Sequence, residues 1–142
     1  MKYYCLVLFF LSFFAFDSSY DKSQNLEFLY PDSNLVINYQ LDWQKIFYIN
    51  RINEFKDDPI GNNKIVFLGN SITYGMRNYE KVFNVNNIVN RGISGDYTEG
   101  VLSRLDEIIY YKPIAVFLLI GLNDFFDDNT LRPKRTPENI GK

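Results

Sequence analysis

The chain has 142 residues, enough for one modest domain. Its composition is 46% hydrophobic and 23% charged, which excludes an intrinsically disordered chain. The formal net charge of -2 provides no electrostatic reason to expect a nucleic-acid partner. There is no histidine, and the acidic residues do not cluster at ligand spacing, so neither a metal site nor a cofactor is expected.

The N-terminus has the pattern of a secretory signal. Lys2 precedes a nearly unbroken apolar run from Cys5 to Phe16, and Asp17-Ser18-Ser19 then turns polar. The run is shorter than the about 20 apolar residues that a membrane span needs. We therefore expect residues 1–19 to be a signal peptide, the protein to be secreted or periplasmic, and no stable membrane span. The alternative, a core helix or strand, is disfavoured because no polar face interrupts the run.

A helix follows an irregular segment. Residues 20–40 are polar and mixed, and we interpret them as a lead-in with a short strand at Leu35-Val36-Ile37. A helix is predicted over Leu41–Phe55, with Asp42 as its cap. Its apolar residues recur at spacings of three and four, so we expect this face to pack in the core: Trp43, Ile46, Phe47, Ile49, Ile52 and Phe55.

The run Ile65–Leu68 is continuously apolar and stops at a glycine, which is typical of a strand buried on both faces. Gly69 and Asn70 both tolerate the backbone angles of a sharp turn. Ser71 then stands at the carboxyl end of the strand, where open α/β sheets place their ligands. Two interpretations of Ser71 are open at this point, a helix cap and a nucleophile.

Two further strands are predicted, each followed by a polar turn. Ile88-Val89 leads to a turn that contains Gly92 and Gly95, and Ile114–Ile120 is a third buried strand that ends at Gly121-Leu122-Asn123-Asp124. Between them a helix is expected from Glu99 to Tyr111. On its apolar face we expect Val101, Leu102, Leu105, Ile108 and Ile109. On its polar face we expect Arg104, Asp106 and Glu107.

Alternating strands and helices predict an α/β fold with a parallel sheet. The carboxyl ends of parallel strands meet at one edge, which would bring together the hydroxyl of Ser71, a glycine N–H and the carboxamide of Asn123. Acyl-transfer enzymes use a nucleophile together with hydrogen-bond donors that stabilise the oxyanion. The alternative is that the glycines and Asn123 serve only the turns.

The three turns resemble the sequence blocks of the SGNH/GDSL hydrolase superfamily, the GDSL-like lipases and acylhydrolases. Gly69-Asn70-Ser71-Ile72-Thr73 resembles the first block, with asparagine where the family name spells aspartate. The segment from Asn90 to Asp96 resembles the second block, and Gly121-Leu122-Asn123-Asp124 resembles the third. The resemblance covers Leu41 onward, most of the chain that would remain after signal cleavage.

This resemblance implies a flavodoxin-like three-layer α/β/α fold. It also implies a catalytic Ser71 and an oxyanion hole formed by the Ser71 N–H, the Gly95 N–H and the Asn123 side chain. For Asp96 and Asp124 we expect structural roles, as caps of the helices that follow or as acceptors behind the site.

The family's fourth block, a late Asp-x-x-His, is missing from the sequence. We therefore expect residues 41–142 to be the N-terminal part of a longer hydrolase, inactive alone. The expected parent is an exported serine esterase that removes short acyl groups such as acetyl from a carbohydrate. A non-catalytic glycan-binding pseudoenzyme of the same fold is the alternative. A phosphate or nucleotide binder is disfavoured because the chain has neither Gly-x-x-x-x-Gly-Lys-Ser/Thr nor Gly-x-Gly-x-x-Gly.

Overall fold

The computed structural model describes residues 26–76 and 78–125. The expected signal peptide and the residues after Phe125 lie outside this range. A three-stranded parallel sheet forms the centre, with β1 (Ile65–Gly69) between β2 (Ile88–Gly92) and β3 (Ala115–Leu119). The predicted α/β class with a parallel sheet is therefore confirmed. The arrangement is compatible with a flavodoxin-like fold.

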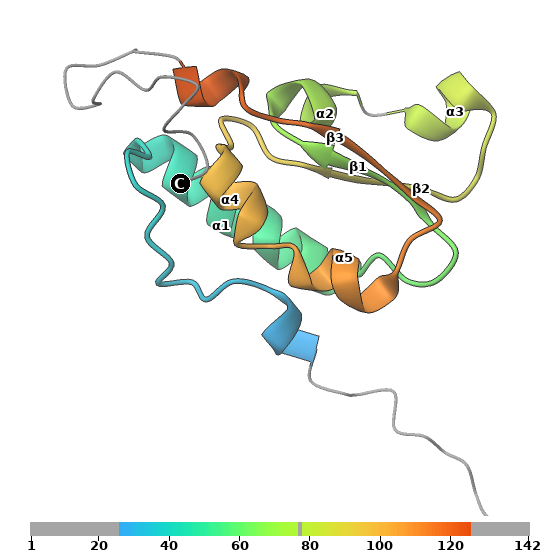
Figure 1. Cartoon of the computed structure of the whole chain (residues 1–142), viewed down its shortest axis with the longest axis horizontal. Helices are drawn as coiled ribbons and strands as arrows, with labels where there is room; N and C mark the ends of the chain where they lie inside the picture. The colour runs from blue at the N-terminus through green and yellow to red at the C-terminus, as the bar shows by residue number, and fades with distance from the viewer. Residues whose placement is uncertain (1–25, 77, 126–142) are drawn as a thin grey trace, which may run out of the picture.

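Helices lie on both sides of the sheet. Figure 1 shows α1 (Asp42–Asp57), α4 (Thr98–Leu102) and α5 (Asp106–Tyr111) on one side, and α2 (Ser71–Gly75) and α3 (Tyr79–Phe83) on the other. Two short 3-10 helices flank these elements, Leu26–Leu29 before α1 and Leu122–Phe125 after β3. None of the helices in the described ranges is long and apolar enough to cross a membrane.

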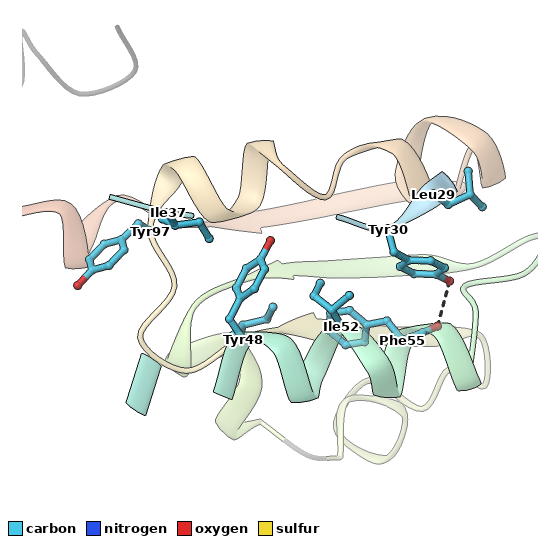
Figure 2. Close-up of a cluster of buried hydrophobic side chains, with 8 residues drawn as sticks. Leu29, Tyr30, Ile37, Tyr48, Ile52, Phe55 and Tyr97 are labelled. Carbon is cyan, nitrogen blue, oxygen red and sulfur yellow. Dashed lines mark hydrogen bonds between the residues drawn. The ribbon is translucent and has the colours of Figure 1, made fainter. Parts of the chain in front are cut away.

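Two buried clusters hold one side of the sheet together. In Figure 2 the lead-in packs on α1, and the Tyr30 hydroxyl donates to the Phe55 carbonyl over 3.0 Å. The second cluster joins β1 to α4 and consists of Ile60, Val66, Leu68 and Val101. On the opposite side of β1, the ring of Phe67 stacks on Tyr79 of α3 and on Phe117 of β3. The alternation of Val66, Phe67 and Leu68 thus supplies both layers with apolar contacts.

The predicted face of the first helix is wrong in part. The helix begins with Asp42 as its first residue and not its cap, because Leu41 occupies the cap position. Trp43 and Ile46 are more than half exposed, whereas Gln44 and Tyr48 are buried. Both polar side chains are buried because each finds a distant partner; the Tyr48 hydroxyl, for example, donates to the Gly100 carbonyl over 2.8 Å.

The predicted helix over Glu99–Tyr111 is interrupted. It forms α4 and α5 with a break at Ser103–Leu105. Leu102 and Ile109, expected in the core, are exposed, and Arg104 and Glu107, expected on the polar face, are buried. The break changes which residues face the sheet, and ion pairs to Asp96 and Arg91 make the burial of these charges possible.

The strand predictions need three corrections. β2 extends to Gly92, beyond the predicted Ile88-Val89, and residues 35–37 are not a strand. β3 is where it was expected, but it is not buried. Val116, Phe117, Leu118 and Leu119 are 41–58% exposed, since β3 pairs with β1 along one side and no described element pairs with its other side.

Candidate active site

The three polar turns lie along one edge of the sheet, at the carboxyl ends of the strands. The register places Gly69 opposite Gly92 on one side and opposite Leu119 on the other. Hydrogen bonds join the turns directly: the Ile93 N–H donates to the Gly69 carbonyl over 3.0 Å, and the Asn70 N–H donates to the Leu119 carbonyl over 3.2 Å. The segments that carry Ser71, Gly95 and Asn123 are therefore neighbours in space.

Ser71 is the first residue of α2 and is not its cap. Asn70 occupies the cap position, and its side-chain oxygen accepts from the Ile72 N–H over 3.1 Å. The interpretation of Ser71 as a helix cap is thus wrong. Its side chain is exposed, and its hydroxyl has no hydrogen-bond partner among the described residues. This hydroxyl is free to meet a ligand at the sheet edge.

Gly95 occupies the third position of a tight turn. The Asp96 N–H donates to the Ile93 carbonyl over 3.3 Å, and Gly95 has a φ of 74°. A φ near this value at that position is characteristic of a type II turn and favours glycine. The turn does not use the Gly95 N–H, and no other described residue accepts from it. A backbone donor is thus left over at the site edge.

Gly92, the other glycine of this turn region, has a structural role. Its N–H already donates to the Asn90 side chain over 2.8 Å. A Cβ at this position would lie 2.2 Å from the backbone nitrogen of Tyr74, so the close approach of β2 to α2 requires a glycine. Of the two glycines, Gly95 is the one whose N–H is unused in the described structure.

Asn123 lies in the 3-10 helix after β3 and is half-buried. Its Nδ2 donates to the Asp96 carbonyl over 2.8 Å, which ties the third turn to the second. A carboxamide nitrogen carries two N–H groups, so this bond leaves one of them for another acceptor. The neighbouring Asp124 accepts from the N–H and the hydroxyl of Thr98 and so holds the start of α4. Asp124 thus has a structural role as expected, although the helix it caps precedes it in the chain.

A buried ion pair between Asp96 and Arg104 lies next to the turns. Asp96 is 1% exposed, and its carboxylate accepts from the Arg104 guanidinium over 2.8 Å and from the Tyr97 N–H over 3.0 Å. The same guanidinium donates to the carbonyls of Gly69 and Arg91, at the ends of β1 and β2. Burial raises the pKa of Asp96 to about 6, and the positive charge of Arg104 opposes this shift. Asp96 therefore has the expected structural role as an acceptor behind the site.

Sequence reasoning missed three residues around this edge: Arg104, Gln44 and Trp43. The Gln44 side chain donates to the Gly95 carbonyl, and the Trp43 ring lies close to the Gly95 α-carbon. Arg104 and Gln44 fell on helix positions that a 3.6-residue period assigns to solvent. No local signal marks a polar helical residue whose partner is far away in the chain.

The hollow beside β2 does not contain the predicted site residues. It has a volume of about 550 Å³, is lined in part by Arg51, Tyr74 and Asn90, and includes none of Ser71, Gly95 and Asn123. Within residues 26–76 and 78–125, no group of three or more acidic, histidine or cysteine side chains could hold a metal ion. Among the described residues, this edge of the sheet offers the Ser71 hydroxyl and the N–H donors of the turns.

No protein-family model matches this chain, and no curated protein matches it either.

Proposed function

We propose that the protein is a serine esterase of the SGNH type, with Ser71 as its nucleophile. The observation that carries the proposal lies at one edge of the sheet, where the Ser71 hydroxyl and the Gly95 N–H have no partner among residues 26–76 and 78–125 and the Asn123 carboxamide lies on the neighbouring turn. A hydroxyl with donors beside it suits the attack on an ester and the charge that follows.

The reaction proceeds in two steps. The Ser71 oxygen attacks the ester carbonyl carbon and passes its proton to a base, and the negative charge moves to the carbonyl oxygen. The N–H groups of Ser71 and Gly95 and the Asn123 carboxamide stabilise this oxyanion. The C–O bond to the alcohol then breaks, the alcohol takes the proton, and an acyl-serine remains until water hydrolyses it.

The mechanism needs a base for the Ser71 proton, and histidine, the usual base at neutral pH, does not occur in the 142 residues. The substrate class is an ester of a short acyl group, such as acetyl, on a carbohydrate. The signal-like pattern of residues 1–19 supports an exported enzyme, secreted or periplasmic.

The test uses the protein as its gene encodes it. Hydrolysis of p-nitrophenyl acetate is measured for the wild type, for Ser71→Ala and for Ser33→Ala, an exposed serine of the lead-in. We expect Ser71→Ala to lower kcat by at least about 10³-fold and Ser33→Ala to leave it unchanged. A fluorophosphonate probe should label the wild type at Ser71. Turnover that survives Ser71→Ala would reject the proposal.

A second candidate is a non-catalytic glycan-binding protein of the same fold. The lack of any histidine in these 142 residues favours it, because a serine without a base is a weak nucleophile. A wild type that neither turns over the ester nor reacts with the probe, yet binds an acetylated oligosaccharide, would select this candidate.

A further inference from the structure

Gln44, in the first turn of α1, reaches across to the turn that contains Gly95. Its side chain is buried, with 5% of the residue exposed. Nε2 lies 3.2 Å from the Gly95 carbonyl oxygen and 2.9 Å from the Tyr97 hydroxyl. Oε1 accepts from the Leu41 N–H over 2.8 Å. Both ends of the carboxamide are thus engaged, and its nitrogen is directed at the glycine.

A glycine at positive φ is not held in place by its own side chain. The peptide groups on either side of it can rotate at low cost unless other contacts fix them. In this turn the Asp96 N–H is bound to the Ile93 carbonyl, and the Gly95 carbonyl is bound to Gln44. Both bonds hold the peptide group between Gly95 and Asp96, so the direction of the Gly95 N–H, which lies in the preceding peptide group, then depends on the backbone angles of Gly95 itself.

Steric contact acts in the same sense. A Cβ built on Gly95 would lie 2.8 Å from Cη2 of Trp43 and 3.0 Å from Cγ of Gln44. The beginning of α1 therefore closes over the α-carbon of Gly95. The turn therefore has little room to move toward α1.

We propose that Gln44 is a positioning residue that aims the Gly95 N–H at the substrate oxyanion. The inference rests on the proposed esterase function, in which that N–H is a donor. Gln44 touches neither the substrate nor the reacting atoms; it acts through the Gly95 carbonyl. An amide is needed because one group must accept from Leu41 while donating to Gly95. A carboxylate or an apolar side chain cannot do both.

The variants Gln44→Glu and Gln44→Met both remove the donor to Gly95. Gln44→Glu keeps the shape and the bond to Leu41, and Gln44→Met avoids a buried charge, so the second serves if the first fails to fold. Tyr97→Phe is the matched control, because it removes the hydroxyl that accepts from Nε2 and donates to Oε1, and it leaves the donor to the Gly95 carbonyl in place. All are made in the protein as its gene encodes it.

The expected result is a loss in kcat of about 10- to 100-fold for the Gln44 variants, with KM within about twofold of the wild type. Tyr97→Phe should stay within about threefold in both. A purely structural role would instead lower the fraction of folded enzyme and leave kcat per folded molecule unchanged. The backbone amide resonance of Gly95 provides a second readout, and it should shift in Gln44→Met but not in Tyr97→Phe.

The outcomes separate the inference from the function on which it rests. If Ser71→Ala abolishes turnover and the Gln44 variants keep the wild-type kcat, the role of Gln44 is overturned and the esterase stands. If turnover does not depend on Ser71, the esterase fails. An unshifted Gly95 amide in Gln44→Met would refute the positioning role in either case.

Discussion

The two edges of the sheet are covered in different ways. Along β2, Arg51 of α1 donates from Nε to the Gly92 carbonyl over 3.3 Å, and its Nη2 lies 3.5 Å from the Asn90 carbonyl oxygen. Behind the same strand, Arg91 forms a buried pair with Glu107 over 2.9 Å. β3 has no ionisable residue, and its apolar side chains are about half exposed.

The difference shows that an apolar strand and a buried strand are not the same thing. β2 contains an asparagine and an arginine, and yet its carboxyl end is buried, because the Asn90 side chain donates to the Thr73 carbonyl of α2 and Arg91 pairs with Glu107 of α5. β3 is wholly apolar, and no described element covers it. Charged groups therefore stabilise one half of the sheet, and apolar contacts with β1 hold the other. Three predictions follow from this contrast.

The largest effect is expected at the buried pair. Glu107→Ala leaves the Arg91 guanidinium buried without its carboxylate, and it also removes the acceptor of the Tyr30 hydroxyl and the Ile60 N–H. Loss of one partner of a buried pair typically costs about 3–5 kcal/mol in the free energy of unfolding. Urea denaturation at neutral pH measures it.

The control is Glu54→Ala, which breaks the ion pair with Arg51 at a side chain that is 60% exposed. A surface pair contributes only about 0–1 kcal/mol. Equal losses in the two variants would contradict the picture of a half-sheet stabilised by buried charge.

A smaller effect is expected from the pH dependence of Asp96. Burial raises its pKa from 3.8 to about 6 in the folded protein, with Asp124 adding to the shift and Arg104 opposing it. The folded state thus binds the proton more tightly than the unfolded state. The contribution of Asp96 to stability is largest below about pH 4, falls as the pH rises from 4 to 6, and is constant above this window.

The shift corresponds to a change of at most roughly 3 kcal/mol across the window, at about 1.4 kcal/mol per pH unit. It is measured as the difference between the wild type and Asp96→Asn in urea unfolding at successive pH values. The Asn variant should lack this component, because its side chain does not titrate. A wild type that gains stability over the same window relative to Asp96→Asn would reverse the sign and refute the prediction.

The smallest effect is expected on β3. Leu118 lies opposite Leu68 in the register of the sheet, but Leu118 is 58% exposed and Leu68 is 2% exposed. We expect Leu118→Ala to cost less than about 1 kcal/mol, because an exposed side chain loses little packing. Leu68→Ala should cost about 2–5 kcal/mol, since it opens a cavity in the core. Thermal and urea unfolding of the two variants measure the difference directly. A loss of several kcal/mol at Leu118 would show that β3 is covered in solution.

Local sequence determined much of the scaffold. The apolar run of β1 and the glycine that stops it were predicted to within one residue, and the turns after all three strands were found where the polar residues indicated. A continuous apolar run and a glycine act over a few residues, so a short window is enough to recognise them. Parallel pairing then places Ser71, Gly95 and Asn123 at the same edge of the sheet.

The tertiary structure decided the rest. Whether Gln44, Arg104 and Glu107 face solvent or the core depends on partners that include groups 13 to 51 residues away in the chain. Periodicity records only the polarity of a side chain, and a polar side chain can be buried when a distant group satisfies it. The same holds for β3, whose exposure depends on what lies beside it and not on its own residues. Hydrophobic patterning therefore determined where the strands and turns occur, and long-range hydrogen bonding determined which faces are buried.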